Sequence, residues 1–270
     1  ATGQYGLTGS EHIWGIPEDG GKIDAALQVD MRSMSSGKYE YDLTTGLQVF
    51  TGTEFFGSLA TSNSEIIHVN TIDSAFGSGW GLAWLQEIVE NDDGSLLLID
   101  GDCTQLLFEA PTETDGSYVS PGGDFSELER LGNGTFRRTM KDQTVYQFDA
   151  QNKLELVRDR NGNEMQYQYN TDGQISKIID PVGLETTFTY TNGKVSSITD
   201  PANRITELKY DTKGNLIEII DPDESSRKWE YDNSHRMTAA TDKRNNRGED
   251  IYDAYGRVKT AIRPDGTLVK

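Results

Sequence analysis

Cysteine and histidine are scarce in this chain. Cys103 is the only cysteine, so the sequence holds no internal disulfide and no cysteine-based zinc site. The three histidines, His12, His68 and His235, lie far apart and match no zinc-ligand spacing. No G-x-S-x-G nucleophile motif occurs. These absences argue against the common metal-dependent and serine hydrolase sites, and we expect the chain not to be an enzyme.

Apolar and basic residues are also few. Only 34% of the 270 residues are hydrophobic, and no run of eighteen apolar residues could cross a membrane. The net charge is −19, and residues 1–150 alone carry 24 acidic and 7 basic residues, a net of −17. A nucleic-acid partner needs a basic face, so this balance argues against one. The apolar residues are periodic and 28 glycines accompany them, which is typical of a sheet protein with many turns.

Acidic residues could suggest a metal site or a hydrolase. Among 44 acids some pair will lie close together by chance, so an acid-rich hydrolase is only a minor alternative. The segments "NDDG" at 91–94 and "DGD" at 100–102 have the composition of calcium loops, but neither matches the EF-hand pattern. Tight turns favour the same residues for backbone reasons. We therefore expect no cofactor, with calcium as the weaker alternative.

The strongest feature of the sequence is a phrase that repeats at steps of 20 or 21 residues between 159 and 256. One copy, residues 180–200, runs from an Asp-Pro turn through a strand to a tyrosine, turns at a glycine and returns. The leading aspartates are Asp159, Asp180, Asp200, Asp221 and Asp242. The tyrosines are Tyr169, Tyr190, Tyr210, Tyr231 and Tyr252. A fixed period of this size indicates an array of supersecondary units rather than one globular core.

Each repeat predicts a β-hairpin. "DPVG" at 180–183 has the residue preferences of a type I turn, and "LETTFTY" at 184–190 alternates between two faces as a half-buried strand does. In the return strand Val195 and Ile198 lie three apart, which predicts a bulge. A single hairpin is not stable alone, but stacked hairpins are. The sequence thus predicts an all-β fold: a twisted, spiralling antiparallel sheet of hairpin repeats.

The turns after the tyrosines use glycine at a left-handed position. Gly173, Gly214 and Gly256 follow their tyrosines by four residues, whereas Gly193 follows Tyr190 by three. The missing residue therefore lies in a loop, where it does least harm. His235 stands where sister repeats have glycine, and Glu224 replaces the glycine of an Asp-Pro turn. Both substitutions predict a cost of about 1 kcal/mol each if the backbone is left-handed there.

The phrases "YTNGKVSSITDPANRIT" (190–206), "YDTKGNLIEIIDPD" (210–223) and "YDAYGRV" (252–258) resemble the YD repeats of the rearrangement-hot-spot (RHS) proteins. Bacterial toxin-complex shells, polymorphic toxins and the teneurins share these repeats. The resemblance covers at least residues 159–266 and extends back to about residue 76. It implies part of a shell in a large secreted or surface protein. The autoproteolytic motif of such shells lies beyond the repeats and is not found here.

Three regions follow from this pattern. Residues 1–70 are predicted to be a β-rich region, a sandwich remnant, with one turn at Thr45-Gly46. Residues 71–158 are predicted to be an RHS-like approach segment of hairpins, in which Trp80 and Trp84 form a buried corner or, as the resemblance implies, a plug. Residues 159–270 are the YD repeats. Because the sequence starts without Met and stops within a repeat, we expect a piece of a longer chain.

The function implied by the resemblance is a non-catalytic scaffold that encloses or displays a C-terminal effector for toxin delivery between cells. Its partner would be the remainder of the same polypeptide, and its location extracellular or on the surface of a bacterial cell. The alternatives are an adhesion or carbohydrate-binding module that contacts glycans or a neighbouring cell, and a fibre-forming structure. A closed interior would favour the shell, whereas an exposed aromatic groove would favour binding.

Overall fold

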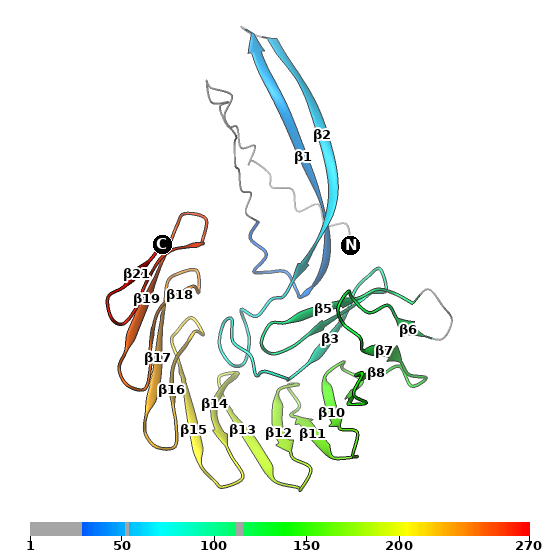
Figure 1. Ribbon diagram of the computed structural model, residues 1–270, viewed down its shortest axis with the longest axis vertical. Coiled ribbons are helices and arrows are strands. Elements are labelled where there is room, and N and C mark those ends of the chain that lie inside the picture. Colours follow the sequence, from blue (N-terminus) through cyan, green and yellow to red (C-terminus); the bar gives the residue numbers. More distant parts are fainter. Residues whose placement is uncertain (1–28, 52–53, 112–115) are drawn as a thin grey trace. The chain divides into compact units, whose positions relative to one another are not determined.

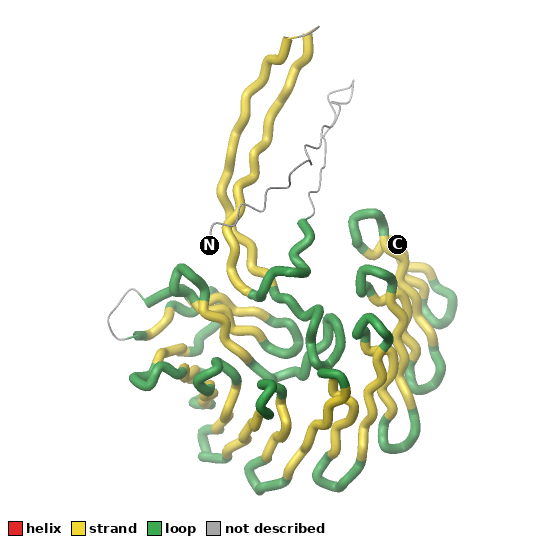
Figure 2. Tube along the Cα trace, turned by 180° about the vertical axis from the view of Figure 1, so that it is seen from behind, coloured by secondary structure: helices red, strands yellow, loops and turns green. Residues whose placement is uncertain are grey.

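The computed structural model describes residues 29–51, 54–111 and 116–270. These residues form strands and turns but no helix (Figures 1 and 2). The all-β prediction is therefore confirmed. Accordingly, the described residues contain no helix that is long and apolar enough to cross a membrane. The chain divides into two compact units, one of residues Met34–Arg204 and one that contains Ile205–Lys270.

The first unit contains an antiparallel sheet in which each strand pairs with its neighbour in sequence. Its strands are β6 (Ser117–Tyr118), β7 (Glu127–Arg130), β8 (Phe136–Thr139), β9 (Val145–Phe148), β10 (Leu154–Arg158), β11 (Glu164–Tyr169), β12 (Ile175–Ile179), β13 (Glu185–Thr191) and β14 (Lys194–Thr199). Sequence order equals spatial order because every connection is a tight turn between antiparallel neighbours.

The second unit continues the same pattern. Its strands are β15 (Ile205–Tyr210), β16 (Leu216–Ile220), β17 (Ser226–Tyr231), β18 (Met237–Thr241), β19 (Arg247–Tyr252), β20 (Val258–Ile262) and β21 (Leu268–Val269). Each of them pairs antiparallel with the next. The hairpin repeat predicted from the sequence thus extends through both units.

The hydrophobic core of the first unit lies between its repeat sheet and a small sheet formed by β3 (Glu87–Glu90), β4 (Leu96–Ile99) and β5 (Gln105–Phe108). All four residues of β4 are buried, which explains the continuous apolar run "LLLI" in an otherwise polar sequence. The amide of Ile88 donates to the carbonyl of Asn152, and the amide of Leu154 donates to the carbonyl of Gln86. These bonds join the small sheet to the turn that precedes β10.

The N-terminal region differs from its prediction. β1 (Gly37–Thr51) and β2 (Glu54–His68) form one long hairpin and pair with no other strand among the described residues. The turn predicted at Thr45-Gly46 is wrong, because β1 continues through both residues and pairs them with Ala60 and Leu59. Two adjacent threonines favour the extended backbone, and the segment lacks the Asn, Asp or Pro that closes most turns. The only strands among the described residues of 29–70 are those of this hairpin, and residues 1–28 lie outside the described part, so the sandwich remnant stays a prediction.

Candidate functional site

The aspartate turns are built by the aspartate side chain itself. In the turn of residues 180–184 the Oδ1 atom of Asp180 accepts hydrogen bonds from the amides of Val182 (2.9 Å) and Leu184 (2.8 Å). The amide of Gly183, which has a φ of 87°, donates to the carbonyl of Asp180 (3.0 Å). Asp159, Asp200 and Asp242 cap their turns in the same way. These residues thus set where each hairpin begins.

Asp221 is the exception among the aspartates. Its carboxylate forms ion pairs with Lys243 and Arg227, and Asp223 caps the local turn by accepting from the Ser225 amide (3.1 Å). The fourth position of the turn has a left-handed backbone all the same, with Glu224 at a φ of 66°. The strain predicted for this substitution is therefore present in the backbone.

The tyrosine turns come in two lengths. Gly173, Gly214 and Gly256 each have a positive φ and close turns of the longer kind. After Tyr190 the strand extends to Thr191, and only Asn192 (φ 52°) and Gly193 (φ 77°) separate it from Lys194. Left-handed conformations at both central residues define the two-residue turn that suits a hairpin. The one-residue deletion thus lies in the turn, as predicted.

A bulge accompanies each tyrosine at the end of its strand. In the hairpin of β13 and β14, Thr189 pairs with Ser197 and Tyr190 pairs with Val195, so Ser196 is the extra residue. The same register shift occurs at Tyr169, Tyr210, Tyr231 and Tyr252. The predicted bulge between Val195 and Ile198 is therefore present, and it recurs in every repeat.

Three of the tyrosine hydroxyls connect a hairpin to the one before it. The hydroxyl of Tyr190 donates to the carbonyl of Ile175 (2.5 Å), that of Tyr169 to Leu154 (2.7 Å) and that of Tyr252 to Met237 (2.6 Å). Each acceptor lies 15 residues earlier and is the first residue of a return strand. Burial raises the pKa of Tyr190 to about 12, and it raises the pKa of Tyr169 further. The hydroxyls therefore remain protonated donors at neutral pH.

The junctions between successive hairpins explain why these hydroxyls are needed. We call the boundaries β10–β11, β12–β13, β16–β17 and β18–β19 the seams. Each seam contains only three residue pairs, all next to the aspartate turn. In β12–β13 the pairing runs from Ile179↔Glu185 to Lys177↔Thr187 and stops there. Beyond that point the hydroxyl of Tyr190 provides the link between the two strands.

The first part of the predicted approach segment, residues 71–86, contacts the repeat sheet at β14. The amide of Val195 donates to the carbonyl of Ala75 (2.8 Å), and the Lys194 Nζ donates to the carbonyl of Ser74 (2.6 Å). The rings of Phe76 and Phe188 meet edge to face with centroids 6.4 Å apart. Burial lowers the pKa of Lys194. Residues 71–86 therefore cover part of the sheet face that carries Phe188.

The two tryptophans of the predicted plug lie in different environments. Trp80 is half-buried, but Trp84 is 78% exposed. The expectation that Trp84 is buried is wrong for the described chain, because its backbone turns outward at a φ of 67° while its amide donates to Asp100 (2.6 Å). A plugging role for the pair remains a prediction.

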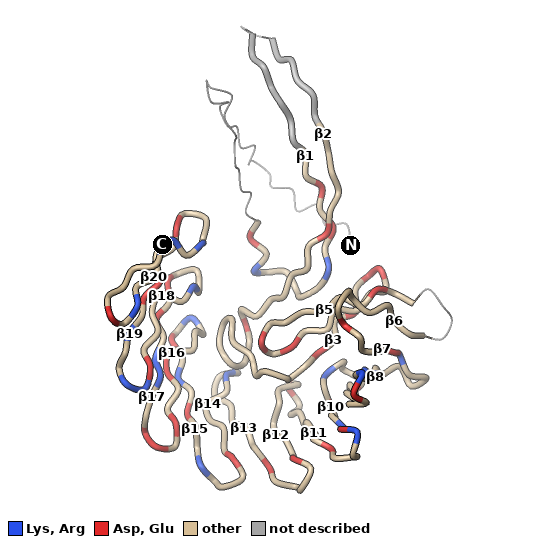
Figure 3. The backbone as a smooth tube through the Cα atoms, viewed as in Figure 1, with Lys and Arg blue, Asp and Glu red and all other residues tan. Residues whose placement is uncertain are grey.

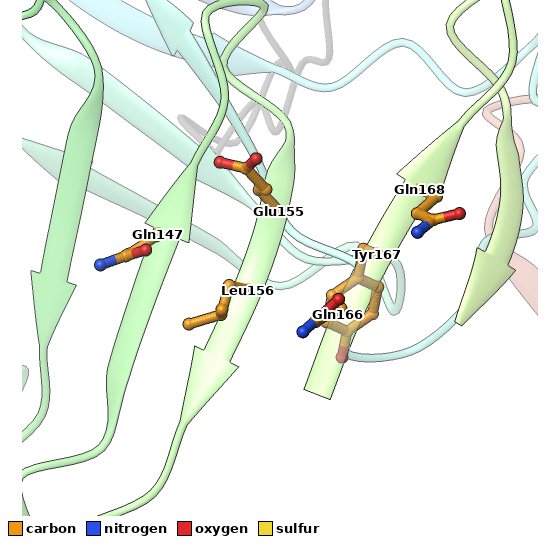
Figure 4. Close-up of a pocket in the computed structure, with 6 residues that line it drawn as sticks. All are labelled: Gln147, Glu155, Leu156, Gln166, Tyr167 and Gln168. Atoms are coloured by element: carbon orange, nitrogen blue, oxygen red, sulfur yellow. The ribbon is translucent and has the colours of Figure 1, made fainter. Parts of the chain in front are cut away.

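A shallow pocket of about 230 Å³ lies at the β10–β11 seam (Figure 4). It is lined by Gln147, Glu155, Leu156, Gln166, Tyr167 and Gln168. Tyr167 is only 8% exposed, so the pocket presents amides and a carboxylate rather than an open aromatic face. Such a lining can hydrogen-bond a polar ligand.

The repeat turns contain both acidic and basic residues (Figure 3). The described residues contain no group of three or more His, Cys, Asp or Glu side chains that could hold a metal ion. In the two segments with calcium-loop composition, Asp93 accepts from Ser95 Oγ (2.6 Å) and Asp102 accepts from the Thr104 amide (2.8 Å). The Ser95 hydroxyl bond is the main reason that the pKa of Asp93 falls to about 2. Both carboxylates thus cap turns, and calcium binding remains an untested alternative.

The structure also contains a buried ion pair, Arg138 with Asp124, that was not predicted from the sequence. Arg138 is 5% exposed and donates to Asp124 (2.6 Å) and to Ser126 Oγ (2.8 Å). The signal was available in the alternation of β8, where Phe136 and Arg138 share the buried face. An arginine at an inward position needs an acceptor, and the loop before β7 supplies it.

These features define a class of protein, a repeat scaffold of β-hairpins joined by tyrosines and aspartate turns. The family model described as RHS Repeat matches residues 169–205 and 210–247. The chain therefore contains RHS repeats, and over this part it is a structural RHS scaffold.

Two bacterial proteins have sequences similar to that of this chain. The chain is 32% identical over 230 residues to the "tRNA nuclease WapA" of Bacillus subtilis (strain 168) and over 228 residues to the "tRNA3(Ser)-specific nuclease WapA" of Bacillus spizizenii. The matches cover 74% and 75% of this chain but only 10% of each relative. The chain therefore spans about a tenth of the length of these proteins.

Two solved structures are also similar. The crystal structure of TcdB2-TccC3-Cdc42 matches 65% of this chain and 12% of its own, with 13% identity and a TM-score of 0.37. The Photorhabdus luminescens Tc holotoxin pore matches 82% of this chain and 14% of its own, with 12% identity and a TM-score of 0.37. Because these TM-scores are low, we assign the fold from the strands described above and not from the similarity to these structures.

Proposed function

We propose that this chain forms part of a non-catalytic wall that encloses or displays a C-terminal effector in a longer polypeptide. The observation that carries the proposal is the repeated joint: a three-pair seam, an aspartate turn and a tyrosine hydroxyl bonded to the preceding hairpin. The residues that recur in the repeats thus serve to join one hairpin to the next. A sheet that grows by repeating this joint suits enclosure of a large object.

The relatives support the remaining parts of the proposal. They are named as tRNA nucleases, and the matched region is 10% of their length. We therefore assign any such activity to a part of the polypeptide outside this chain, and the scaffold role to the chain itself. Both relatives come from bacteria, and we place this protein outside the cell or on the surface of a bacterial cell, where it serves competition between cells.

The test is electron microscopy of the full-length polypeptide combined with limited proteolysis. We expect a closed wall with density inside, and a C-terminal part that resists protease until the wall is cut. Replacing Tyr169 and Tyr190 with Phe should weaken two seams and speed cleavage of that part. An open ribbon or a solid rod, or a C-terminal part that is cleaved at once in the wild type, would overturn enclosure and leave display or fibre building.

Carbohydrate binding is the second candidate, and the pocket at the β10–β11 seam is the observation that favours it. Gln166 and Gln168 present amide groups that can bind sugar hydroxyls. A glycan array probed with the full-length protein tests the idea. Binding that disappears in the Gln166→Ala, Gln168→Ala variant, but persists when the turn residue Gln151 is changed to Ala, would establish it. No bound glycan, or equal loss in both variants, would rule this pocket out.

A further inference from the structure

Residues 74–86 are attached to the repeat sheet at two of its strands. At one end, the carbonyl of Ala75 accepts a hydrogen bond from the amide of Val195 in β14 (2.8 Å). At the other end, the carbonyl of Gln86 accepts a hydrogen bond from the amide of Leu154 in β10 (3.1 Å). Val195 and Leu154 are both fully buried, so water has little access to either bond. The segment therefore ties two strands of one sheet to each other.

The two attachment points are equivalent positions of successive hairpins. Leu154, Ile175 and Val195 each lie at a register shift near the start of their strands, β10, β12 and β14. The segment is bonded to the first and the third of these positions. It therefore spans two repeats of the array.

The pairing of the sheet between these points fixes its twist only loosely. The seams β10–β11 and β12–β13 contain three residue pairs each. Neighbouring strands rotate by about −20 to −25° on average, and the angle ranges from about −10 to about −35°. Four strand boundaries separate β10 from β14, so the relative direction of these two strands depends on the sum of four such angles. A tie between the two strands removes much of this freedom.

The segment between the attachment points is itself tightly folded. The amide of Gly77 donates to the carbonyl of Ser74 (3.0 Å), and Ser74 Oγ donates to the carbonyl of Trp80 (2.5 Å). Gly81 lies so close to the β4–β5 turn that a Cβ atom on it would be 2.1 Å from the carbonyl oxygen of Gly101. The segment is thus held against the small sheet, and it cannot stretch without breaking these contacts.

Lys194 strengthens the attachment at β14 by departing from the pattern of its equivalents. In two earlier hairpins the residue at this place reaches the tyrosine turn of the next hairpin, where Lys153 Nζ and Gln174 Nε2 each donate to a glycine carbonyl. Lys194 Nζ instead donates to the carbonyl of Ser74 (2.6 Å). A side chain whose equivalents join two hairpins is therefore used here to hold the segment.

We propose that residues 74–86 act as a brace that fixes the separation and the relative twist of β10 and β14. The ends of the brace are its backbone bonds to these two strands, and the Lys194 bond and the contact of the Phe76 ring with β13 strengthen the second end. The hairpins between the ends are then held at one twist instead of a range of twists. This role does not depend on what the wall encloses or displays.

Distance measurements between two spin labels in the full-length polypeptide test the brace. Labels attached through p-acetylphenylalanine replace Asn161 and Ala202, which are exposed turn residues after β10 and β14. We expect one narrow distance distribution when the brace is intact. Phe76→Ala combined with Lys194→Met should widen this distribution by about twofold, because the strand boundaries regain their range of twist.

Two further variants control for effects unrelated to the brace. Lys177→Met removes a lysine of β12 that pairs with Glu185, and Leu128→Ala creates a cavity at β7, whose partner strands are β6 and β8. Both should leave the width of the distribution unchanged. An unchanged width in the brace variant, or equal widening by Leu128→Ala, would overturn the proposal.

A measurement without substitutions decides the matter if the brace variant does not fold. In the wild-type polypeptide the amide of Val195 should exchange with solvent as slowly as that of Leu154, because both are bonded to the brace at buried positions. A Val195 amide that exchanges as fast as that of the exposed turn residue Asn192 would show that the end at β14 is open, which contradicts a brace. Enclosure is tested by microscopy and proteolysis, so the two proposals can fail separately.

Discussion

The tyrosine hydroxyl is the smallest feature that links one hairpin to the next. At Tyr190 it donates to the Ile175 carbonyl, and the three-pair seam makes no backbone bond at that level. Since Ile175 is 3% exposed, water cannot readily replace the donor. A buried carbonyl without a donor costs about 1–3 kcal/mol. The hydroxyl, rather than the ring alone, therefore explains why tyrosine and not phenylalanine stands there.

Replacing Tyr190 with Phe should lower the free energy of unfolding by about 1–2 kcal/mol, because the ring still packs but the Ile175 carbonyl loses its donor. Urea unfolding followed by circular dichroism measures the change. Tyr41→Phe is the matched control, because that tyrosine is 46% exposed, and it should change stability by less than about 0.5 kcal/mol. Equal effects in the two variants would contradict a role for the hydroxyl.

Two of the left-handed positions that lack glycine, Glu224 and His235, should respond to glycine in opposite directions. Glu224 has a φ of 66° and an exposed side chain, so Glu224→Gly should stabilise by about 0.5–1 kcal/mol. His235 has a φ of 63°, but its Nδ1 lies 2.7 Å from Oδ1 of Asn215, which is fully buried. Losing that bond outweighs the relief of strain, so His235→Gly should destabilise by up to about 2 kcal/mol. The same unfolding assay decides, and stabilisation by His235→Gly would show that strain dominates.

At the scale of the element, the aspartate turn holds the hairpin's register. Asp180 accepts two backbone amides with one carboxylate oxygen, and the seam begins immediately beside this turn. Misplacing the turn by one residue would move the apolar side chains of β13 to the other face of the sheet. The turn therefore controls packing as well as chain reversal.

Asp180→Ala should destabilise the protein by about 1 kcal/mol, because the amides of Val182 and Leu184 lose their acceptor. Asp180→Asn keeps an Oδ1 acceptor and should cost less than about 0.5 kcal/mol. Hydrogen exchange at the amides of 182 and 184 reports the loss directly. If Asn is as harmful as Ala, the negative charge matters and not the hydrogen-bonded turn.

The elements that could be predicted from the sequence are those fixed by local chemistry. Turn residues and alternation lie within a few positions of each other, so the hairpins, the bulge at Val195 and the short turn at Gly193 follow from the sequence alone. The acceptor of a tyrosine hydroxyl lies 15 residues away across a seam, and no local pattern reveals it. The exposure of Trp84 likewise depends on how the approach segment meets Asp100. The full length of β1 does not follow from the sequence, because Thr45-Gly46 has the composition of a turn but pairs with Ala60 and Leu59.

Across the whole chain, low pH should weaken the hydrogen bonds of many turns at once. Hydrogen bonds from turn backbones and neighbouring side chains lower the pKa of exposed aspartates in several turns, among them Asp159, Asp200 and Asp242. A carboxyl with a lowered folded pKa stabilises the fold above its unfolded pKa, near 4, and loses that contribution as the pH falls through the folded value. Because many turns lose this contribution together, the free energy of unfolding of the repeat array should depend strongly on pH below about 4.

We therefore expect stability to hold or rise between pH 7 and about 4.5, where loss of the net charge of −19 relieves repulsion, and to fall below about pH 4. Urea unfolding at several pH values measures this. Added salt should reduce the change in stability between pH 7 and about 4.5, because it screens the repulsion. It should leave the loss of stability below about pH 4 unchanged, because the hydrogen bonds of the turns are short-range. A continued rise of stability down to pH 3 would show that repulsion, not turn capping, governs the acid response.

The seams have a further consequence at the level of the gene. A segment from one leading aspartate to the next, such as Asp159 to Asp180, is 21 residues long and starts and ends at equivalent backbone positions. An in-frame duplication of such a segment would insert one more hairpin whose two seams are already complementary to its neighbours. Repeat number can therefore change by recombination without any compensating substitution, and the array of hairpins can lengthen or shorten while its seams keep the same register.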